Sequence, residues 1–212
     1  MSELATNKIS PVTGTNVTLG DSGDTFTIAS GASITGGSIA AASLTGSLPA
    51  ISGAALTGVG KVVQVVNVHA GGIATGTTVI PHDTSIPQIS EGTEFMTLAV
   101  TPTNASNKLI IRVGAFHTSS VVSRWILGAL FQDSTANALS SAMPYYHAVS
   151  PATIGSDLTM HHYMTAGTTS ETTFRYRAGL SVAGTISFNG QSSDVRFGGT
   201  LSSSITIWEI SA

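Results

Sequence analysis

Beyond residue 60 the chain consists of short segments rich in β-branched and aromatic residues, each bounded by turn residues. Turn signals such as Ala70-Gly71-Gly72, Pro102-Thr103-Asn104 and Asn189-Gly190 recur between these segments. In this region no stretch of helical length repeats its apolar residues with the period of about 3.6 that an amphipathic helix needs. The pattern therefore predicts an all-β head, built as an antiparallel β-sandwich or jelly roll.

The turn signals also divide the head into ten expected strands. These lie at residues 61–69, 77–81, 95–101, 108–116, 124–132, 144–149, 158–164, 172–182, 185–188 and 204–210. Strands of this length at short, regular spacing are typical of sandwiches.

Alternation along two of these segments predicts which faces are covered. In residues 174–177 the aromatic residues fall on one side and the arginines on the other. In residues 205–210, by contrast, Ile205 and Ile207 share one face while Trp208 and Ile210 share the other. We therefore expect the last segment to be an interior strand, covered by the core on one face and by a neighbouring subunit or another segment on the other.

Residues before 60 have a different character, because Gly, Ser, Thr and Ala predominate among them. Three similar short units, built around Ile34, Leu44 and Leu56, follow one another at spacings of ten and twelve residues. Each has too little apolar surface for a single chain to offset an ordering entropy of about 1–2 kcal/mol per residue. We expect several copies to wind about a common axis, each giving one apolar residue per layer. A flexible linker is the alternative.

Composition excludes several classes of protein. With 42% hydrophobic and only 9% charged residues, the chain does not have the composition of a disordered protein. A net charge of −3 with scattered Lys and Arg disfavours a nucleic-acid partner. No apolar run approaches the roughly 20 residues of a spanning helix, so no membrane insertion is expected. Residues 1–4 lack the features of a secretory signal, which predicts synthesis in the cytoplasm.

Four segments resemble bacteriophage tail fibre proteins. They are GDSGDTFTIASGA at 20–32, ASLTGSLPAISGAALTGVG at 42–60, SNKLIIRV at 106–113 and ITIWEI at 205–210. The sequence departs from the commoner form of the first motif at Ala29, where proline is expected.

The resemblance implies a homotrimeric virion fibre protein, assembled on the exterior of the particle. Residues 1–19 are then a segment that attaches to other virion proteins, 20–60 a thin trimeric shaft, and 61–212 the β-sandwich head. The residues expected to pack between the three chains are Phe26, Ile28, Ile34, Leu44, Leu56 and Trp208.

His161-His162 is the most suggestive metal motif, because a trimer can place one histidine per chain around an axial ion. Adjacent residues of a strand point to opposite faces, however, whereas metal ligands converge. We therefore expect one surface and one packed histidine, and no metal. No cofactor is expected either, and the absence of Cys excludes disulfides and thiolate ligands.

Aromatic and amide side chains are the expected receptor-binding groups, since sugar rings stack on aromatic faces and amides bind hydroxyls. The candidates are Tyr145, Tyr146, His147, His161, His162, Tyr163, Asn189 and Gln191. The alternative is that half of each aromatic cluster fills the core. No nucleophile motif is present, and the sequence assigns no catalytic residue, so we expect a protein that is not an enzyme.

Two functions of different kinds follow. The first is a trimeric fibre whose head binds a glycan or protein of the host envelope through three weak sites. The second is a capsid-decorating, cement or adaptor protein that has no receptor-binding role.

Overall fold

The computed structural model describes residue 13, residues 62–147 and residues 155–212, and for residues 145–147 it describes the backbone alone. Apart from Thr13, these residues belong to one compact unit, Gly53–Ala212. The expected attachment segment and shaft, the boundaries at 19/20 and 60/61, and the packing residues Phe26, Ile28, Ile34, Leu44 and Leu56 lie outside the described residues. They stay predictions.

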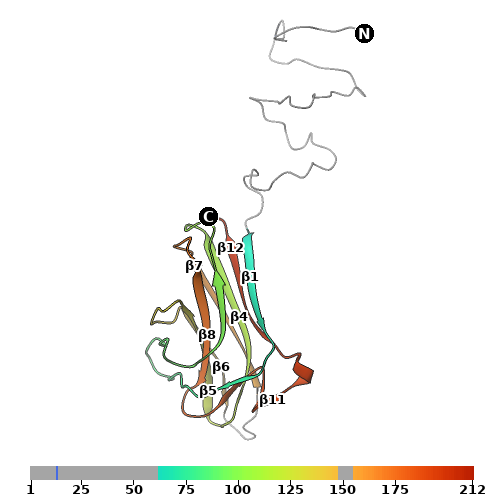
Figure 1. The fold of residues 1–212 in the computed structure, drawn as a ribbon. Coiled ribbons are helices and arrows are strands. Elements are labelled where there is room, and N and C mark those ends of the chain that lie inside the picture. Colours follow the sequence, from blue (N-terminus) through green and yellow to red (C-terminus); the bar gives the residue numbers. More distant parts are fainter. Residues whose placement is uncertain (1–12, 14–61, 148–154) are drawn as a thin grey trace, which may run out of the picture. The chain divides into compact units, whose positions relative to one another are not determined.

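Eight longer strands form the head (Figure 1). They are β1 (Val62–Ala70), β3 (Thr93–Val100), β4 (Lys108–Ser119), β5 (Arg124–Gln132), β6 (Ser140–His147), β7 (Gly155–Thr165), β8 (Thr172–Leu180) and β12 (Ser203–Ile210). Shorter elements are β2 (Ala74–Gly76), β9 (Ile186–Phe188), β10 (Gly190–Gln191), β11 (Asp194–Val195) and the single 3-10 turn η3 (Phe197–Gly199). Within the described ranges there is no α-helix, as expected.

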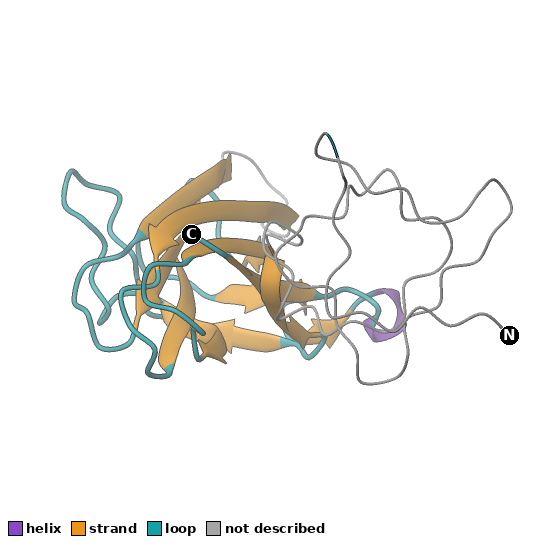
Figure 2. Ribbon diagram, turned by 90° about the horizontal axis from the view of Figure 1, so that it is seen from above, coloured by secondary structure: helices purple, strands orange, loops and turns teal. Residues whose placement is uncertain are grey.

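The strands form two main antiparallel sheets. One has the order β1-β12-β4-β9-β2, with β7 paired to the other edge of β4, and the second has the order β3-β8-β5-β6. The eight long strands thus pair first with last, second with seventh, third with sixth and fourth with fifth: β1 with β12, β3 with β8, β4 with β7, and β5 with β6. This nested pairing is that of a jelly roll. Figure 2 shows the head from above, with the strands in orange arranged around its interior.

The core lies between the two sheets and follows from alternation along the strands. In β8, Phe174 and Tyr176 are fully buried, while Arg175 and Arg177 lie on the opposite face, where both pair with Glu94 at 3.3 Å. In β12, Ile205 and Ile207 are fully buried on the core side. The prediction of an all-β antiparallel head is therefore confirmed.

A second, smaller core covers the outer face of the β3-β8-β5-β6 sheet. Here Ile80 packs with Ala129 and Phe131, and Ile89 and Leu127 contact the same cluster. The expected strand at 77–81 is wrong, because this segment forms no ladder and the short strand β2 precedes it. Its β-branched residues instead cover β5 as an extended loop, held by hydrogen bonds from Ile80 N to Leu180 O and from Gly92 N to Val79 O.

Within the described ranges the other expected strands are present, with shifts of a few residues at their ends, and residues 61, 148 and 149 of the expected strands lie outside those ranges. The segment 124–132 matches β5 without change, whereas β4 and β7 are both longer than expected. In the part of the chain that the structure describes, no helix has the length and apolar character needed to cross a membrane.

Candidate binding site

The outer face of the β1-β12-β4-β7 sheet carries a row of apolar side chains. Val65 lies opposite Trp208, Trp208 opposite Ile110, and Ile110 opposite Tyr163. The exposed fractions are 52% for Val65, 37% for Ile110 and 63% for Tyr163, and Trp208 is half-buried. We call these four residues the outer apolar row. Trp208 therefore lies on an interior strand, with its indole on the outer face opposite the buried Ile205 and Ile207, as expected.

Polar residues border this row on one side. The next set of partners toward the middle of the strands is Asn67, Thr206, Arg112 and His161. Asn67 Nδ2 donates to Thr206 Oγ1 at 2.8 Å, which orders two of these side chains. An exposed apolar patch with a polar rim is the usual form of a protein interaction surface.

His161, His162 and Tyr163 fall on alternate faces of β7. His161 and Tyr163 are exposed on the outer side, while His162 points the other way and is half-buried. Burial lowers the pKa of His162. The expectation of one surface and one packed histidine agrees with this arrangement. Among the described residues no group of three His, Asp or Glu side chains is arranged to hold a metal ion.

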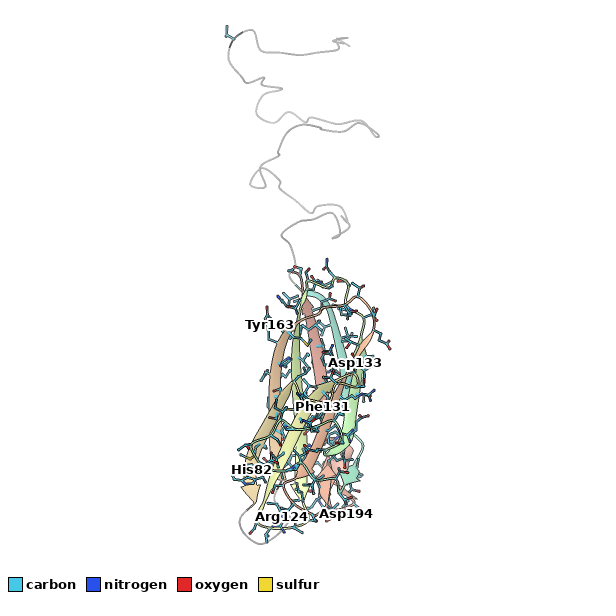
Figure 3. The ribbon with its side chains drawn as sticks, turned by 90° about the vertical axis from the view of Figure 1, so that its left-hand side faces the viewer. His82, Arg124, Phe131, Asp133, Tyr163 and Asp194 are labelled. Carbon is cyan, nitrogen blue, oxygen red and sulfur yellow. The ribbon has the colours of Figure 1, made fainter. Side chains whose placement is uncertain are left out.

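The two aromatic clusters expected to bind a receptor are not brought together. Tyr145, Tyr146 and His147 are the last residues of β6 and lie opposite Ile126, Trp125 and Arg124 of β5. Figure 3 shows Arg124 toward one end of the head and Tyr163 toward the other. The clusters therefore belong to opposite ends of the sandwich.

Asn189 is not available to an external ligand, which corrects the expectation for this residue. It is only 2% exposed, and its Nδ2 donates to Ala70 O at 2.6 Å. Ser203 Oγ donates to Asn189 Oδ1 at 2.6 Å, so both ends of the amide are used inside the head. This role could not be predicted from the sequence, because Ala70 lies 119 residues away and Ser203 lies 14 residues away beyond another turn.

Gln191 remains at the surface, beside the η3 turn. Its Oε1 accepts a hydrogen bond from Arg196 Nε at 2.9 Å. Together with Phe116, Arg196 and the exposed Phe197, it lines a shallow pocket of about 190 Å³.

A larger pocket, of about 230 Å³, lies between the loop that follows β2 and strands β5 and β6. Ile80, Pro81 and Pro87 of the loop and Leu127, Ala142 and Met143 of the strands give it apolar surface. His82, Asp83, Ser85 and Ser141 add polar groups. We call it the loop pocket. It was not foreseen from the sequence, because its two sides lie about 40 to 60 residues apart in the chain.

Asp83 and His82 are held in defined positions at the loop pocket. Asp83 Oδ1 accepts hydrogen bonds from Ser85 N at 2.7 Å and from Ser85 Oγ at 2.5 Å, and these bonds lower the pKa of the Asp83 carboxyl. The His82 ring stacks at a tilt on Trp125, with ring centroids 5.1 Å apart.

Comparisons with known proteins add little to this geometry. No model of a protein family and no curated protein matches the chain. Among solved structures, the VP2 subviral particle of infectious bursal disease virus is similar at a TM-score of 0.36 and 11% identity, over 70% of this chain and 38% of that one. The structure of the Gx strain of the same virus gives a TM-score of 0.34 at 11% identity, over 70% of this chain and 37% of that one.

The enzymatically active domain of tailspike protein 4 of bacteriophage CBA120 is also similar, at a TM-score of 0.25 and 15% identity. The match covers 58% of this chain and 18% of that one. The chain thus spans less than two fifths of the length of these viral proteins.

Proposed function

We propose that this chain is a structural fibre protein of a bacteriophage virion, that it acts as a homotrimer, and that its head binds a receptor on the host surface. Its role is binding and not catalysis. The motifs at 20–32 and 42–60 that resemble tail fibre proteins support the fibre, and the outer apolar row supports the trimer.

The outer apolar row is the observation that carries the proposal. A single head leaves Val65, Ile110 and Tyr163 open to water beside the half-buried Trp208. Each square ångström of apolar surface removed from water contributes roughly 25 cal/mol, so covering such a row stabilises an assembly. Trp and Tyr are also the residues that most often dominate the energy of protein interfaces.

The occupant of this face is a second copy of the same chain. Strand β1 begins at Val62, which lies opposite Ile210 in the next set of partners beyond the outer apolar row. The segment expected to wind about a common axis with its copies joins the head directly before this point. A trimeric shaft joined to the head at this residue keeps three heads together, and a contact through the face that β1 and β12 share would cover the outer apolar row.

Light scattering of the full-length protein at micromolar concentration tests the assembly. We expect the mass of three chains, and a monomer mass would contradict the proposal. Trp208→Lys places a charge in the outer apolar row and should weaken the trimer, measured as a fall in mass on dilution. Thr159→Lys, on the exposed side of β7, is the matched control. If Trp208→Lys dilutes like the parent, this face is not the contact between subunits.

The position of the protein on the virion tests the rest of the function. Labelled antibody against the head should mark a fibre that projects from the particle, and purified protein should bind host cells. Labelling over the capsid shell without binding to cells would favour the alternative role of a decorating or adaptor protein.

A further inference from the structure

The loop that forms one side of the loop pocket is held at both of its ends by backbone hydrogen bonds. At one end, Ile80 N donates to Leu180 O at 3.1 Å. At the other, Ala138 N donates to Pro87 O at 2.9 Å, and Gln88 forms an isolated β-bridge with Asn137. A site that is already ordered loses little conformational entropy when a ligand binds. Both ends of this loop are therefore fixed before any ligand binds.

The charges that line the loop pocket do not favour an anion. No Lys or Arg lines it, and Asp83 is its one carboxylate. Both hydrogen bonds from Ser85 fall on Asp83 Oδ1, so Oδ2 is left to accept bonds from a ligand. Asp83 is exposed, so its carboxylate can reach a ligand in the pocket, although water competes for the same bonds. The pocket thus suits a neutral molecule that carries several hydroxyl groups.

The size and lining of the loop pocket further limit the class of ligand that fits it. A volume of about 230 Å³ is small for a ligand pocket and limits the ligand to about the size of a single sugar ring. The apolar surface of Leu127 and Met143 lies across from the polar groups of the loop. His82, which also lines the pocket, packs against Trp125 with ring centroids 5.1 Å apart, so the pocket has an aromatic ring in its lining. A pyranose has the same division, with apolar C–H faces and a polar edge of hydroxyls.

We propose that the loop pocket binds one neutral sugar ring, with Asp83 Oδ2 and Ser141 Oγ accepting bonds from its hydroxyls and the apolar wall and His82 contacting its C–H faces. The proposal rests on the proposed function, because it names the class of receptor that the head recognises. Three copies of a weak site of this kind give a trimer useful avidity.

Binding of free sugars to the full-length protein tests this site. The probes are D-glucose, D-galactose and N-acetyl-D-glucosamine, measured by saturation-transfer NMR, with N-acetylneuraminic acid as the anionic control. At least one neutral sugar should bind with a Kd on the order of millimolar, and the anionic sugar should not. A bound sugar should also change the fluorescence of Trp125, and Trp125→Phe should remove that signal.

Two variants assign the binding to the loop pocket. Ser141→Tyr fills the pocket and should abolish sugar binding, while Thr159→Tyr, on the outer face of the other sheet, should leave it unchanged. Asp83→Asn keeps the turn that Ser85 closes but removes the charge, and should weaken binding at least fivefold. Each variant is checked for an unchanged melting temperature.

The outcomes separate this proposal from the fibre role. The sugar site is wrong if the trimer binds host cells but none of the neutral sugars, or if Ser141→Tyr leaves binding to cells unchanged. Either result leaves the fibre role intact and indicates a protein receptor. Sugar binding that is lost in Ser141→Tyr supports the pocket. A monomeric protein that still binds sugar there overturns the trimer but not the pocket.

Discussion

Asn107 Nδ2 donates a hydrogen bond of 2.6 Å to Glu209 Oε1 across 102 residues of sequence. Glu209 is 0% exposed, and the same oxygen accepts bonds from Thr103 N and Thr103 Oγ1 at 2.8 Å. Gln64 Nε2 donates to the other oxygen at 2.5 Å. The carboxylate thus ties the turn after β3 and strand β1 to the last strand. Burial raises the pKa of Glu209, but the bonds from Gln64, Asn107 and Thr103 outweigh it and hold the pKa at about 2.

Glu209→Gln should destabilise the head by on the order of 2–4 kcal/mol at pH 7, because charge-assisted bonds are lost and a second amide faces Gln64. Chemical denaturation at pH 7 measures this. Asp157→Asn, at an exposed position of β7, is the control and should change stability little. A Glu209→Gln variant as stable as the parent would show that the charge is not needed.

The same carboxylate makes stability depend on pH in acid. Its pKa is about 2 in the folded head against 4.5 as the ordinary value, so the unfolded state binds the proton first. The contribution of Glu209 is therefore full above pH 4.5 and is lost as the pH falls toward 2, with a slope of up to about 1.4 kcal/mol per pH unit. Stability of the parent and of Glu209→Gln, measured from pH 5 to pH 2, should converge.

A second buried pair acts at higher pH. His117 Nε2 lies 2.6 Å from Tyr176 Oη, both residues are fully buried, and Phe95 and Phe188 surround the imidazole. Burial lowers the pKa of His117 to about 3, against the smaller opposing effect of the Ser187 backbone. The unfolded chain binds this proton near pH 6.5, so stability should fall as the pH drops from 6.5 toward 3.

Replacing both members of the pair isolates this effect. His117→Phe with Tyr176→Phe removes the two polar groups together, so it should cost little at pH 7 and flatten the stability profile between pH 6.5 and pH 5. Tyr176→Phe alone leaves the histidine without its hydroxyl partner and should cost about 1–3 kcal/mol. An unchanged slope in the double variant would assign the acid sensitivity to other groups.

Alternation along the chain predicted the strands well, because each face of a sandwich strand is set by residues two apart. Phe174 and Tyr176 were correctly separated from Arg175 and Arg177, and Ile207 from Trp208. The same rule failed at 77–81. There, Thr, Val and Ile favour a strand, yet a second apolar face on β5 is covered by this loop, and nothing local records that face.

Sites built from distant segments could not be predicted from the sequence. The partners of Glu209 are 102 to 145 residues away, and the loop pocket joins residues near 82 to residues near 142. Asn189 lies in an Asn-Gly turn whose sequence is typical of a surface loop, but in the folded head its amide is hydrogen-bonded to Ala70 and Ser203. Composition and residue spacing do not predict such contacts.

Asn189→Ala should therefore reduce stability and not binding. Its amide satisfies the Ala70 carbonyl and the Ser203 hydroxyl inside the head, and a positive φ of 55° disfavours alanine there. Leaving buried polar groups unpaired costs about 1–3 kcal/mol. Thermal melts measure the loss, and Ser193→Ala in the neighbouring turn is the control. A variant that melts like the parent but binds host cells less well would restore Asn189 as a recognition residue.

Ile207 and Trp208 are neighbours in β12 whose side chains serve different contacts. Ile207 is fully buried between the sheets, so Ile207→Ala should destabilise each head by about 2–4 kcal/mol at any protein concentration. Trp208 belongs to the outer apolar row, so Trp208→Ala should act mainly on association.

A trimer that unfolds to single chains melts at a temperature that rises with protein concentration. Melting curves over a hundredfold range of concentration distinguish the two residues: Ile207→Ala should lower the melting temperature but keep its dependence on concentration, whereas Trp208→Ala should reduce that dependence. If both variants shift the curves in parallel, the indole stabilises the single head and the outer apolar row is not a subunit contact.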